Sequence, residues 1–356
     1  MAHFRGLRNK EIERQPSIDF LRFMAAMMVA TMHWGLEIGS DRYSAIYKLP
    51  IIGDLVKNGS FGVNIFFVIS GFVIIGTAQR YTAVEFVFAR FTRLFPGLFI
   101  CMLIVLIVGS HFIQSYERPY TSFFHSVFLT YQAAEVEPLA TPLWTLIIEI
   151  KFYLGVAIAL LVFPSLFKTT KGIIALLIAW QLCIAVLQET TSFIGSFILP
   201  YLTLDGFSNL FALGVCFNLA SNARRGLNQE NVLILMVSLY FIYEVFFLED
   251  YPHILKIYLA LTSVLIIYST KLSLNYSKRK LTYWLGLSSY PIYLLHEHLG
   301  MAIILQIQSK LSMNIYFVIG AASVGITMFS ALIAITFEKP IQKYLKALFN
   351  RFYLKN

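Results

Sequence analysis

Charged residues are scarce in this chain of 356 residues: 13% are Asp, Glu, Lys or Arg, against about 25% in a soluble globular protein. Hydrophobic residues make up 58% of the chain, and its mean hydropathy is +0.70. This composition excludes a disordered protein, a nucleic-acid-binding domain and an ordinary cytosolic enzyme. The net charge of +9 is expected at a membrane face, where anionic lipids attract Lys and Arg.

Cysteine is also rare. Cys101, Cys183 and Cys216 lie in separate apolar runs. An odd and scattered set predicts neither a disulfide framework nor a metal-ligand cluster, so small core side chains and no bound metal are expected. A phosphate-cradling glycine loop and an HExxH zinc motif are missing from the sequence as well.

Long apolar runs are what the chain has in abundance, and they predict an all-α membrane protein with about ten transmembrane helices. The segment 83–94 is basic and aromatic and is expected to lie along the membrane interface. The stretch 121–131 is too short to span. The predicted spans are 18–36, 59–78, 95–113, 143–167, 172–188, 193–219, 231–248, 254–270, 282–307 and 314–337.

The distribution of basic residues predicts the topology. The first run is too long for a signal peptide and lacks a cleavage site, so it is expected to be a retained span. With both termini cytoplasmic, twenty basic residues fall in inside segments and six in outside segments, which is the positive-inside pattern. The expected organisation is a cytoplasmic segment 1–17, a single membrane domain 18–340 and a cytoplasmic basic tail 341–356.

The first span carries three polar side chains, Asp19, Arg22 and His33. A charge in the middle of a span costs about 2.5–3.5 kcal/mol, so such residues are functional candidates. Asp19 and Arg22 share a helix face and could pair. Arg22 and His33 also share a face, about 16 Å apart along the axis. The alternatives are snorkelling for Arg22 and hydrogen-bonded packing for His33.

The fourth span carries Glu149 at an outer depth similar to that expected for His33. A carboxylate beside a histidine is a general-base arrangement, because it orients the imidazole and stabilises its cation. The alternative is a structural ion pair of Glu149 with Lys151 or Arg42. Lys151 itself needs a partner or a water-filled cavity.

Two further groups of polar residues stand out. Arg90 and Arg93 are expected at the cytoplasmic face, where their guanidinium groups suit phosphate; anchoring to anionic lipid is the alternative. In the ninth span Ser289, Tyr293 and His296 share one face, next to Pro291, which is expected to kink the helix. A polar helix–helix contact is the alternative for that face. Asp205, in the sixth span, is a weaker candidate.

In this order, the polar residues resemble the motifs of the acyltransferase-3 family, the integral-membrane O-acyltransferases. Each motif alone is weak evidence for the family, but several motifs in the same order on a ten-span chain are specific to it. The motifs are Ser17-Ile18-Asp19, Arg22 and His33 spaced as Arg-x10-His, the second-span run 62–72, Arg90 with Arg93 and Pro96, Trp144-Thr145-Leu146 with Glu149, Ser289-Tyr290 with Tyr293 and His296, and Glu338-Lys339-Pro340.

The chain departs from the family pattern at several positions. Asn64 stands where the family usually has Asp, Ile150 and Lys151 stand where Glu and Gln are frequent, and Pro291 stands where Ser is frequent. Many relatives carry a soluble hydrolase-like domain after the last span, and this chain stops soon after Pro340. We therefore expect the acceptor to be handled by the membrane part or with a partner.

The resemblance implies that an acyl group, most often acetyl from acetyl-CoA, is transferred from the cytoplasmic side to a hydroxyl of an envelope carbohydrate or lipid-linked saccharide outside. It also implies a bacterial inner (cytoplasmic) membrane. Arg90, Arg93 and Arg22 would bind the CoA phosphates. His33, with Asp19 and Arg22 on the same span, would act as general base or carry the acyl group briefly, and Glu149 would orient it.

The remaining candidates are residues that would contact the substrate. Ser70, Asn64 and Tyr290 could donate to the thioester oxyanion. The other candidates for substrate contact are Trp144, Lys151, Tyr153, Tyr293 and His296. No metal and no nucleic-acid partner is expected. Membrane lipids are expected partners, and the sequence leaves the oligomeric state open.

Alternative interpretations come from other classes of protein. A transporter or flippase for a lipid-linked saccharide would also line a cavity with Arg, Glu and His, although no inverted repeat is evident. A non-catalytic scaffold would not need Arg22, His33 and Glu149 to converge. A membrane-bound O-acyltransferase of the other well-known class uses His and Asn, and the Arg-x10-His spacing argues against it.

Overall fold

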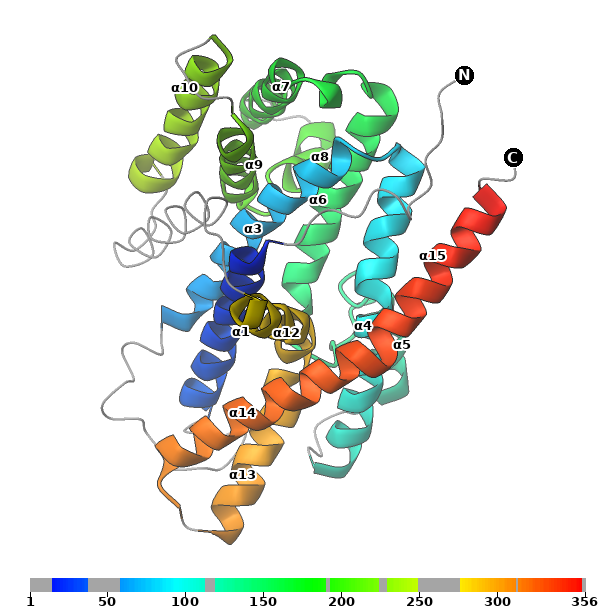
Figure 1. Cartoon of the computed structure of the whole chain (residues 1–356), viewed down its shortest axis with the longest axis vertical. Coiled ribbons are helices and arrows are strands. Elements are labelled where there is room, and N and C mark those ends of the chain that lie inside the picture. Colours follow the sequence, from blue (N-terminus) through cyan, green and yellow to red (C-terminus); the bar gives the residue numbers. More distant parts are fainter. Residues whose placement is uncertain are drawn as a thin grey trace. The chain divides into compact units, whose positions relative to one another are not determined.

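The computed structural model describes residues 15–37, 58–112, 119–189, 193–223, 229–248, 276–311 and 313–353. These ranges are helical and contain no strand, which confirms the all-α prediction for this part of the chain (Figure 1). The α-helices are α1 (Pro16–Glu37), α3 (Phe61–Ala78), α4 (Ala83–Phe112), α5 (Pro119–Val127), α6 (Leu143–Val162), α7 (Thr170–Gln188), α8 (Phe193–Leu202), α9 (Ser208–Asn222), α10 (Gln229–Tyr243), α12 (Tyr276–Leu295), α13 (Met301–Lys310), α14 (Ile315–Ile333) and α15 (Lys339–Tyr353).

Short helical turns separate or extend these helices. Two are 3-10 turns, η2 (Asn58–Ser60) and η3 (Leu166–Lys168). The π-helical turns among the described residues are η4 (Glu244–Leu248), η5 (His296–Gly300) and η6 (Ala334–Glu338). A π turn holds an extra residue within a helix and is frequently found at functional sites.

Six of the described helices are long and apolar enough to cross a membrane, as expected of a multi-pass membrane protein. They lie where six of the predicted spans were placed. They are Asn58–Ala78, Ala83–Val108, Leu143–Val162, Thr170–Gln188, Gln229–Phe247 and Ile315–Tyr353. The predicted span 254–270 lies outside the described residues, so the count of ten and the cytoplasmic position of both termini stay predictions.

The prediction of one continuous span over 193–219 was wrong. The structure divides it into α8 and α9, joined by a turn in which Leu204, Asp205 and Gly206 have φ angles of 52°, 54° and 95°. These left-handed conformations end a helix, and Gly and Asp adopt them more readily than other residues. The turn could not be predicted from the sequence, because the residues on both sides of it form one long apolar run.

The segment 83–94 does not form an interfacial helix of its own, as the sequence analysis expected. It is the first part of α4, which continues to Phe112 with Pro96 inside it. Proline removes one backbone donor and favours a bend, but it does not end this helix. The basic residues of this segment therefore lie at one end of a long helix.

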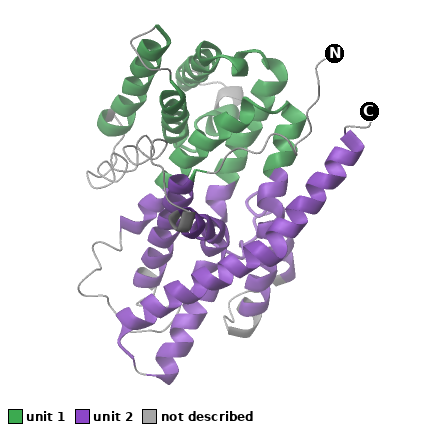
Figure 2. Ribbon diagram, in the orientation of Figure 1, with its two compact units in different colours: residues 1–15, 64–90, 147–272 green, residues 16–63, 91–146, 273–356 purple. Residues whose placement is uncertain are grey.

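Two compact units divide the chain and are coloured separately in Figure 2. Unit 1 comprises residues 1–15, 64–90 and 147–272, and unit 2 comprises residues 16–63, 91–146 and 273–356. Three helices, α3, α4 and α6, contribute residues to both units.

Glycines bring α3 and α9 into backbone contact within unit 1. A Cβ atom at Gly71 would clash with the carbonyl oxygen of Phe211, and one at Gly214 would lie 2.8 Å from the backbone nitrogen of Phe72. The side-chain amide of Asn218 donates to the Phe72 carbonyl at 2.9 Å. Small residues are the usual means by which helices approach closely in a membrane.

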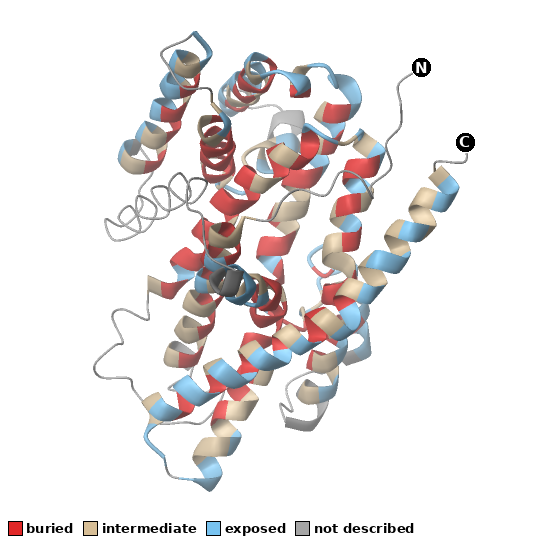
Figure 3. Ribbon diagram, in the orientation of Figure 1, coloured by how far each residue is buried: buried red, intermediate tan, exposed pale blue. Residues whose placement is uncertain are grey.

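Within unit 2, α1 packs along α12 and also contacts η5 and α14. The contact with α12 is close, since a Cβ atom at Gly286 would lie 2.6 Å from the Asp19 carboxyl carbon. Burial follows the packing in both units: α9 is buried along most of its length, whereas α15 has no buried residue (Figure 3).

The cysteines only partly follow the prediction of core side chains. Cys101 and Cys216 are buried, but Cys183 is exposed on α7. An exposed cysteine within an apolar helix is consistent with a side that faces lipid, which composition alone could not distinguish from the core.

Candidate active site

His33 and His296 form a histidine pair in unit 2. Their ring centroids lie 5.0 Å apart, with the ring planes inclined at 58°. His33 is half-buried near the end of α1, and His296 is fully buried as the first residue of η5. The sequence analysis placed both residues in the outer halves of their spans but did not predict that they meet.

The backbone around His296 fixes which ring nitrogen carries the proton. Nδ1 lies 2.8 Å from the carbonyl oxygen of Tyr293 and 3.2 Å from that of Ile292. Carbonyl oxygens only accept hydrogen bonds, so Nδ1 is the donor, and in the neutral imidazole Nε2 is then the acceptor. Nε2 is buried and makes no hydrogen bond within the described part of the chain. His296 thus has one ring nitrogen without such a partner, in a ring that lies beside that of His33.

The π turn η5 is clamped on both sides of His296. The Trp34 indole N–H donates to the His296 carbonyl at 2.8 Å, and a Cβ atom at Gly300 would lie 2.7 Å from the Trp34 ring. The buried Glu297 carboxylate accepts two hydrogen bonds from Thr141, from its backbone N–H at 2.7 Å and from its hydroxyl at 2.6 Å. These contacts hold the extra residue of the turn in place.

Tyr293 contacts the start of α6. Its hydroxyl lies 2.7 Å from the Thr145 hydroxyl, and Thr145 donates to the Pro142 carbonyl at 2.9 Å. The Tyr293 hydroxyl also lies 3.5 Å from the Pro142 carbonyl oxygen, so both hydroxyls gather at this carbonyl. A role for Tyr293 in substrate contact stays a prediction; the contact shown is a polar link between two helices, the alternative that the sequence left open.

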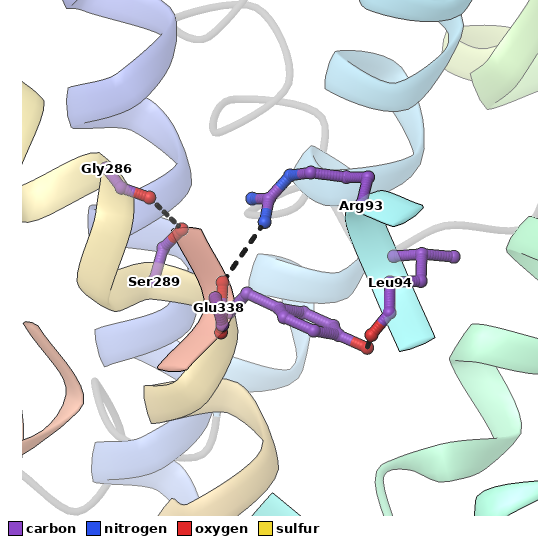
Figure 4. A network of polar contacts seen from close by, with 6 residues as sticks. Arg93, Leu94, Gly286, Ser289 and Glu338 are labelled. Carbon is purple, nitrogen blue, oxygen red and sulfur yellow. Dashed lines mark hydrogen bonds and ion pairs between the residues drawn. The ribbon is translucent and has the colours of Figure 1, made fainter. Parts of the chain in front are cut away.

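Arg93 belongs to a second cluster of unit 2, drawn in Figure 4. One guanidinium nitrogen lies 3.5 Å from a carboxylate oxygen of Glu338, whose side chain is only 2% exposed. The Arg93 guanidinium also lies 5.6 Å from the centroid of the Tyr290 ring, and the Tyr290 hydroxyl donates to the Leu94 carbonyl at 3.1 Å. Gly97 makes room, because a Cβ atom there would lie 2.6 Å from the second Glu338 oxygen.

Unit 1 holds a separate cluster around Glu149. One carboxylate oxygen accepts hydrogen bonds from the hydroxyls of Ser70 and Tyr153, each at 2.5 Å. Ser70 and Tyr153 are buried, and Glu149 is half-buried. Ser70 and Tyr153 are thus hydrogen-bonded to Glu149, and the role in substrate contact predicted for them stays a prediction.

Removing the acceptor of these two hydroxyls is expected to destabilise unit 1. Glu149→Ala leaves both donors without a partner, which costs about 1–3 kcal/mol, whereas Tyr153→Phe removes one bond and costs about 0.5–1.5 kcal/mol. Thermal unfolding of the detergent-solubilised variants measures the difference. Glu149→Gln retains an acceptor and serves as the matched control; equal losses for all three variants would contradict the assignment.

Arg90 lies beside the Glu149 cluster. Its guanidinium donates to the Thr77 hydroxyl at 3.1 Å and lies 5.8 Å from the Phe86 ring centroid and 5.9 Å from that of Tyr153. Its Nε is buried and has no hydrogen-bond partner among the described residues. Arg90 is thus held by one side-chain hydrogen bond and by two aromatic rings.

Lys151 pairs with Asp205. The ammonium lies 2.7 Å from a carboxylate oxygen of Asp205 and 5.0 Å from the centroid of the Tyr201 ring. The partner that the sequence analysis required for Lys151 is therefore an acid that follows α8. The alternative ion pair between Glu149 and Lys151 was wrong for this reason, and Arg42 lies outside the described residues.

The other predicted site residues are placed as follows. Asp19 is buried and Arg22 half-buried, both on α1 with His33. Asn64 is buried in unit 1, and Trp144 is 37% exposed. His33 belongs to unit 2 and Glu149 to unit 1, so their predicted pairing stays a prediction.

Sequence reasoning missed Glu297 and gave no site role to Glu338. Both carboxylates are 1% exposed, and both lie in π turns. Glu297 falls inside a predicted span, so the rule that a charge within a span is a functional candidate would have found it. The contact of Glu338 with Arg93 could not be predicted, because the two residues are 245 positions apart in the sequence.

The fold and these clusters define a multi-pass helical membrane protein that buries histidines and carboxylates among its helices. Within the described residues, no group of three or more His, Cys, Asp or Glu side chains is placed to hold a metal ion.

The chain belongs to the acyltransferase-3 family. The family's acyltransferase domain matches residues 15–337, which include the site residues described above except Glu338. The chain is also similar to the peptidoglycan O-acetyltransferase OatA of Listeria monocytogenes, at 26% identity over 321 residues. That match covers 79% of this chain and 48% of the relative, so the chain spans about half the length of the curated relative. No solved structure matches the chain.

Proposed function

We propose that the protein transfers an acetyl group from acetyl-CoA on the cytoplasmic side to a hydroxyl of an envelope carbohydrate on the outer side. The acyltransferase domain supports acyl transfer, and a relative named for O-acetylation of peptidoglycan supports acetyl as the group and a carbohydrate as the acceptor. The excess of basic residues in the segments predicted to be inside supports a cytoplasmic donor.

The observation that carries this proposal is the histidine pair. Acyl transfer to a hydroxyl needs a base that takes the hydroxyl proton as the oxygen attacks the thioester carbon. His33 is the half-buried member of the pair and can reach a ligand, whereas His296 is enclosed. The bare Nε2 of His296 is suited to accept the N–H of His33, which directs the other nitrogen of His33 toward the acceptor.

In the proposed step, the acceptor oxygen forms a bond to the carbonyl carbon and the carbon–sulfur bond of the thioester breaks. The hydroxyl proton passes to His33 and then to the departing CoA sulfur, so the base is restored. A brief acyl-histidine at His33 is the alternative route and balances in the same way. The thioester supplies the driving force in both.

Arg22, Arg90 and Arg93 remain the proposed phosphate ligands of CoA, with different local settings. Within the described residues, the Arg90 guanidinium contacts only the neutral Thr77 hydroxyl by a hydrogen bond, whereas Arg93 faces the Glu338 carboxylate. A phosphate that binds Arg93 must therefore share it with Glu338. Arg22 lies on the same helix as His33, about 16 Å away along its axis, and this spacing separates a phosphate site from the site of chemistry.

Donor binding is expected to weaken when Arg90 is replaced. Arg90→Gln removes charge-assisted hydrogen bonds worth about 1.5–3 kcal/mol, so the KM for acetyl-CoA should rise by about 10- to 100-fold while kcat changes little. Initial rates over a range of acetyl-CoA concentrations measure this. Arg351→Gln, in α15, is the control, and an equal rise in KM for that variant would show a general effect of charge.

The test of the function is CoA release from acetyl-CoA by the purified protein in nanodiscs with an envelope carbohydrate extract. The proposal expects CoA release together with labelling of the carbohydrate from radioactive acetyl-CoA. The alternative, a transporter of a lipid-linked saccharide, expects saccharide movement across proteoliposomes without consumption of acetyl-CoA. Failure to bind or consume acetyl-CoA in the presence of the extract would overturn the acyl-CoA assignment.

A further inference from the structure

The last described helix, α15, differs in composition from the helix that precedes it. α14 is almost entirely apolar, whereas α15 contains Lys339, Lys343, Lys346 and Arg351 and no acidic residue. The sequence analysis treated most of this segment as a basic tail, and the structure shows that it is helical to Tyr353. α15 follows α14 through the π turn η6 (Figure 1).

The side chains of α15 separate into two opposite faces. At about 100° per residue, one arc of about 60° holds only apolar side chains. The opposite arc, also about 60° wide, holds three lysines and an asparagine. The apolar arc contains Ile341, Leu345, Leu348 and Phe352, and the polar arc contains Lys339, Lys343, Lys346 and Asn350.

Neither face is fully buried by the described part of the chain. Ile341, Leu345 and Leu348 are half-buried, and Phe352 is 66% exposed (Figure 3). On the polar arc Lys343 is exposed, and the Lys339 ammonium lies 4.2 Å from the centroid of the Tyr283 ring. Another exposed helix, α10, has its polar residues Gln229, Glu230 and Asn231 at one end and is mostly apolar beyond them, as suits the lipid interior. α15 cannot be placed there without burying its lysines in hydrocarbon.

α14, η6 and α15 run on from one another as one helix, Ile315–Tyr353. We propose that this helix bends at the π turn η6 in the membrane, so that α15 lies in the plane of the membrane surface and binds anionic lipid. Its apolar arc would enter the boundary between headgroups and acyl chains, and its lysines would reach the lipid phosphates. The absence of acidic residues in α15 complements a surface of negative charge, which attracts nearby Lys and Arg. Continuity with the apolar helix α14 brings α15 to the membrane whatever reaction the protein performs.

Spin labels on the two faces of α15 test its position. The full-length protein with Cys183→Ser is placed in nanodiscs, and a label is attached at Phe352→Cys or at Asn350→Cys. We expect collisions with oxygen, relative to collisions with a water-soluble nickel chelate, to be several-fold more frequent at position 352 than at position 350. Two water-exposed labels, or two labels deep in hydrocarbon, would overturn the proposal; the second result would make α15 part of a transmembrane helix.

The choice of lipid tests the role of the lysines. Nanodiscs of phosphatidylcholine are compared with nanodiscs that also contain phosphatidylglycerol, with the label at position 352. The anionic lipid should move the label deeper in the otherwise unchanged protein and in the variant with Lys343→Arg and Lys346→Arg, but not in the variant with Lys343→Gln and Lys346→Gln. The same response in the Arg and Gln variants, or no response in any protein, would refute anionic-lipid binding.

Discussion

Replacing His33 with alanine is expected to lower the rate of acetyl transfer by about 10²- to 10⁴-fold, the usual contribution of a general base. The half-buried imidazole of His33 would be the group that takes the acceptor proton, and alanine cannot do so. The rate of CoA release in the presence of the carbohydrate acceptor, with protein in nanodiscs, measures the loss. His125→Ala is the control, since this ring, in α5, contacts the hydroxyl of Thr130 just after the helix and takes no part in the pair.

The partner histidine should show a different signature. His296→Gln retains a side chain of similar reach but cannot present the same bare nitrogen, so we expect a smaller loss than for His33→Ala and a changed pH profile of kcat. Binding of acetyl-CoA should be retained in both variants. If His33→Ala keeps the wild-type rate, the general-base assignment fails, whatever the outcome at His296.

Three glycine-to-alanine substitutions in unit 1 are expected to fall into two groups, two that destabilise it and one that does not. Gly71→Ala and Gly214→Ala each place a Cβ atom against backbone, the carbonyl oxygens of Phe211 and Val68 respectively. Overpacking of this kind typically costs about 1–3 kcal/mol. Gly155→Ala on α6 meets no atom within 4 Å, so it should be neutral or should stabilise by up to about 1 kcal/mol through helix propensity.

Thermal unfolding in detergent, followed by the loss of monodisperse protein, measures the three glycine variants side by side. Because all three are the same substitution within apolar helices of one unit, the comparison isolates the helix contact. Equal midpoints for Gly155→Ala and Gly214→Ala would show that α3 and α9 do not pack as described.

Helix identity could be predicted well from apolar length, because a run of twenty apolar residues has few other uses. The interruptions of these helices could not be predicted from apolar length. The break at Leu204 to Gly206 depends on left-handed backbone conformations, which the surrounding apolar residues hide. The π turn at His296 leaves no mark in the pattern either, because inserting one residue into a helix hardly changes its composition.

For the site, individual polar residues could be predicted from the sequence, but the contacts between residues on different helices could not. The sequence singled out His33, His296 and Glu149 as polar groups within spans, and the structure shows them buried or half-buried. It paired His33 with Glu149 by depth alone, and depth cannot decide which helices are neighbours. The contacts of Glu149 with Ser70 and of Lys151 with Asp205 depend on packing between helices, so only the three-dimensional arrangement shows them.

Because of the π turn η5, the number of residues in this part of the helix sets the orientation of the segment that follows. A conservative substitution within His296–Gly300 leaves every later residue of the helix in its place. Deleting one residue there would restore a regular α-helix and rotate the following segment by about 100°, which would carry the Gly300 side of the helix away from Trp34. Relatives that use the same pair of histidines should therefore vary in sequence across this turn yet keep its length.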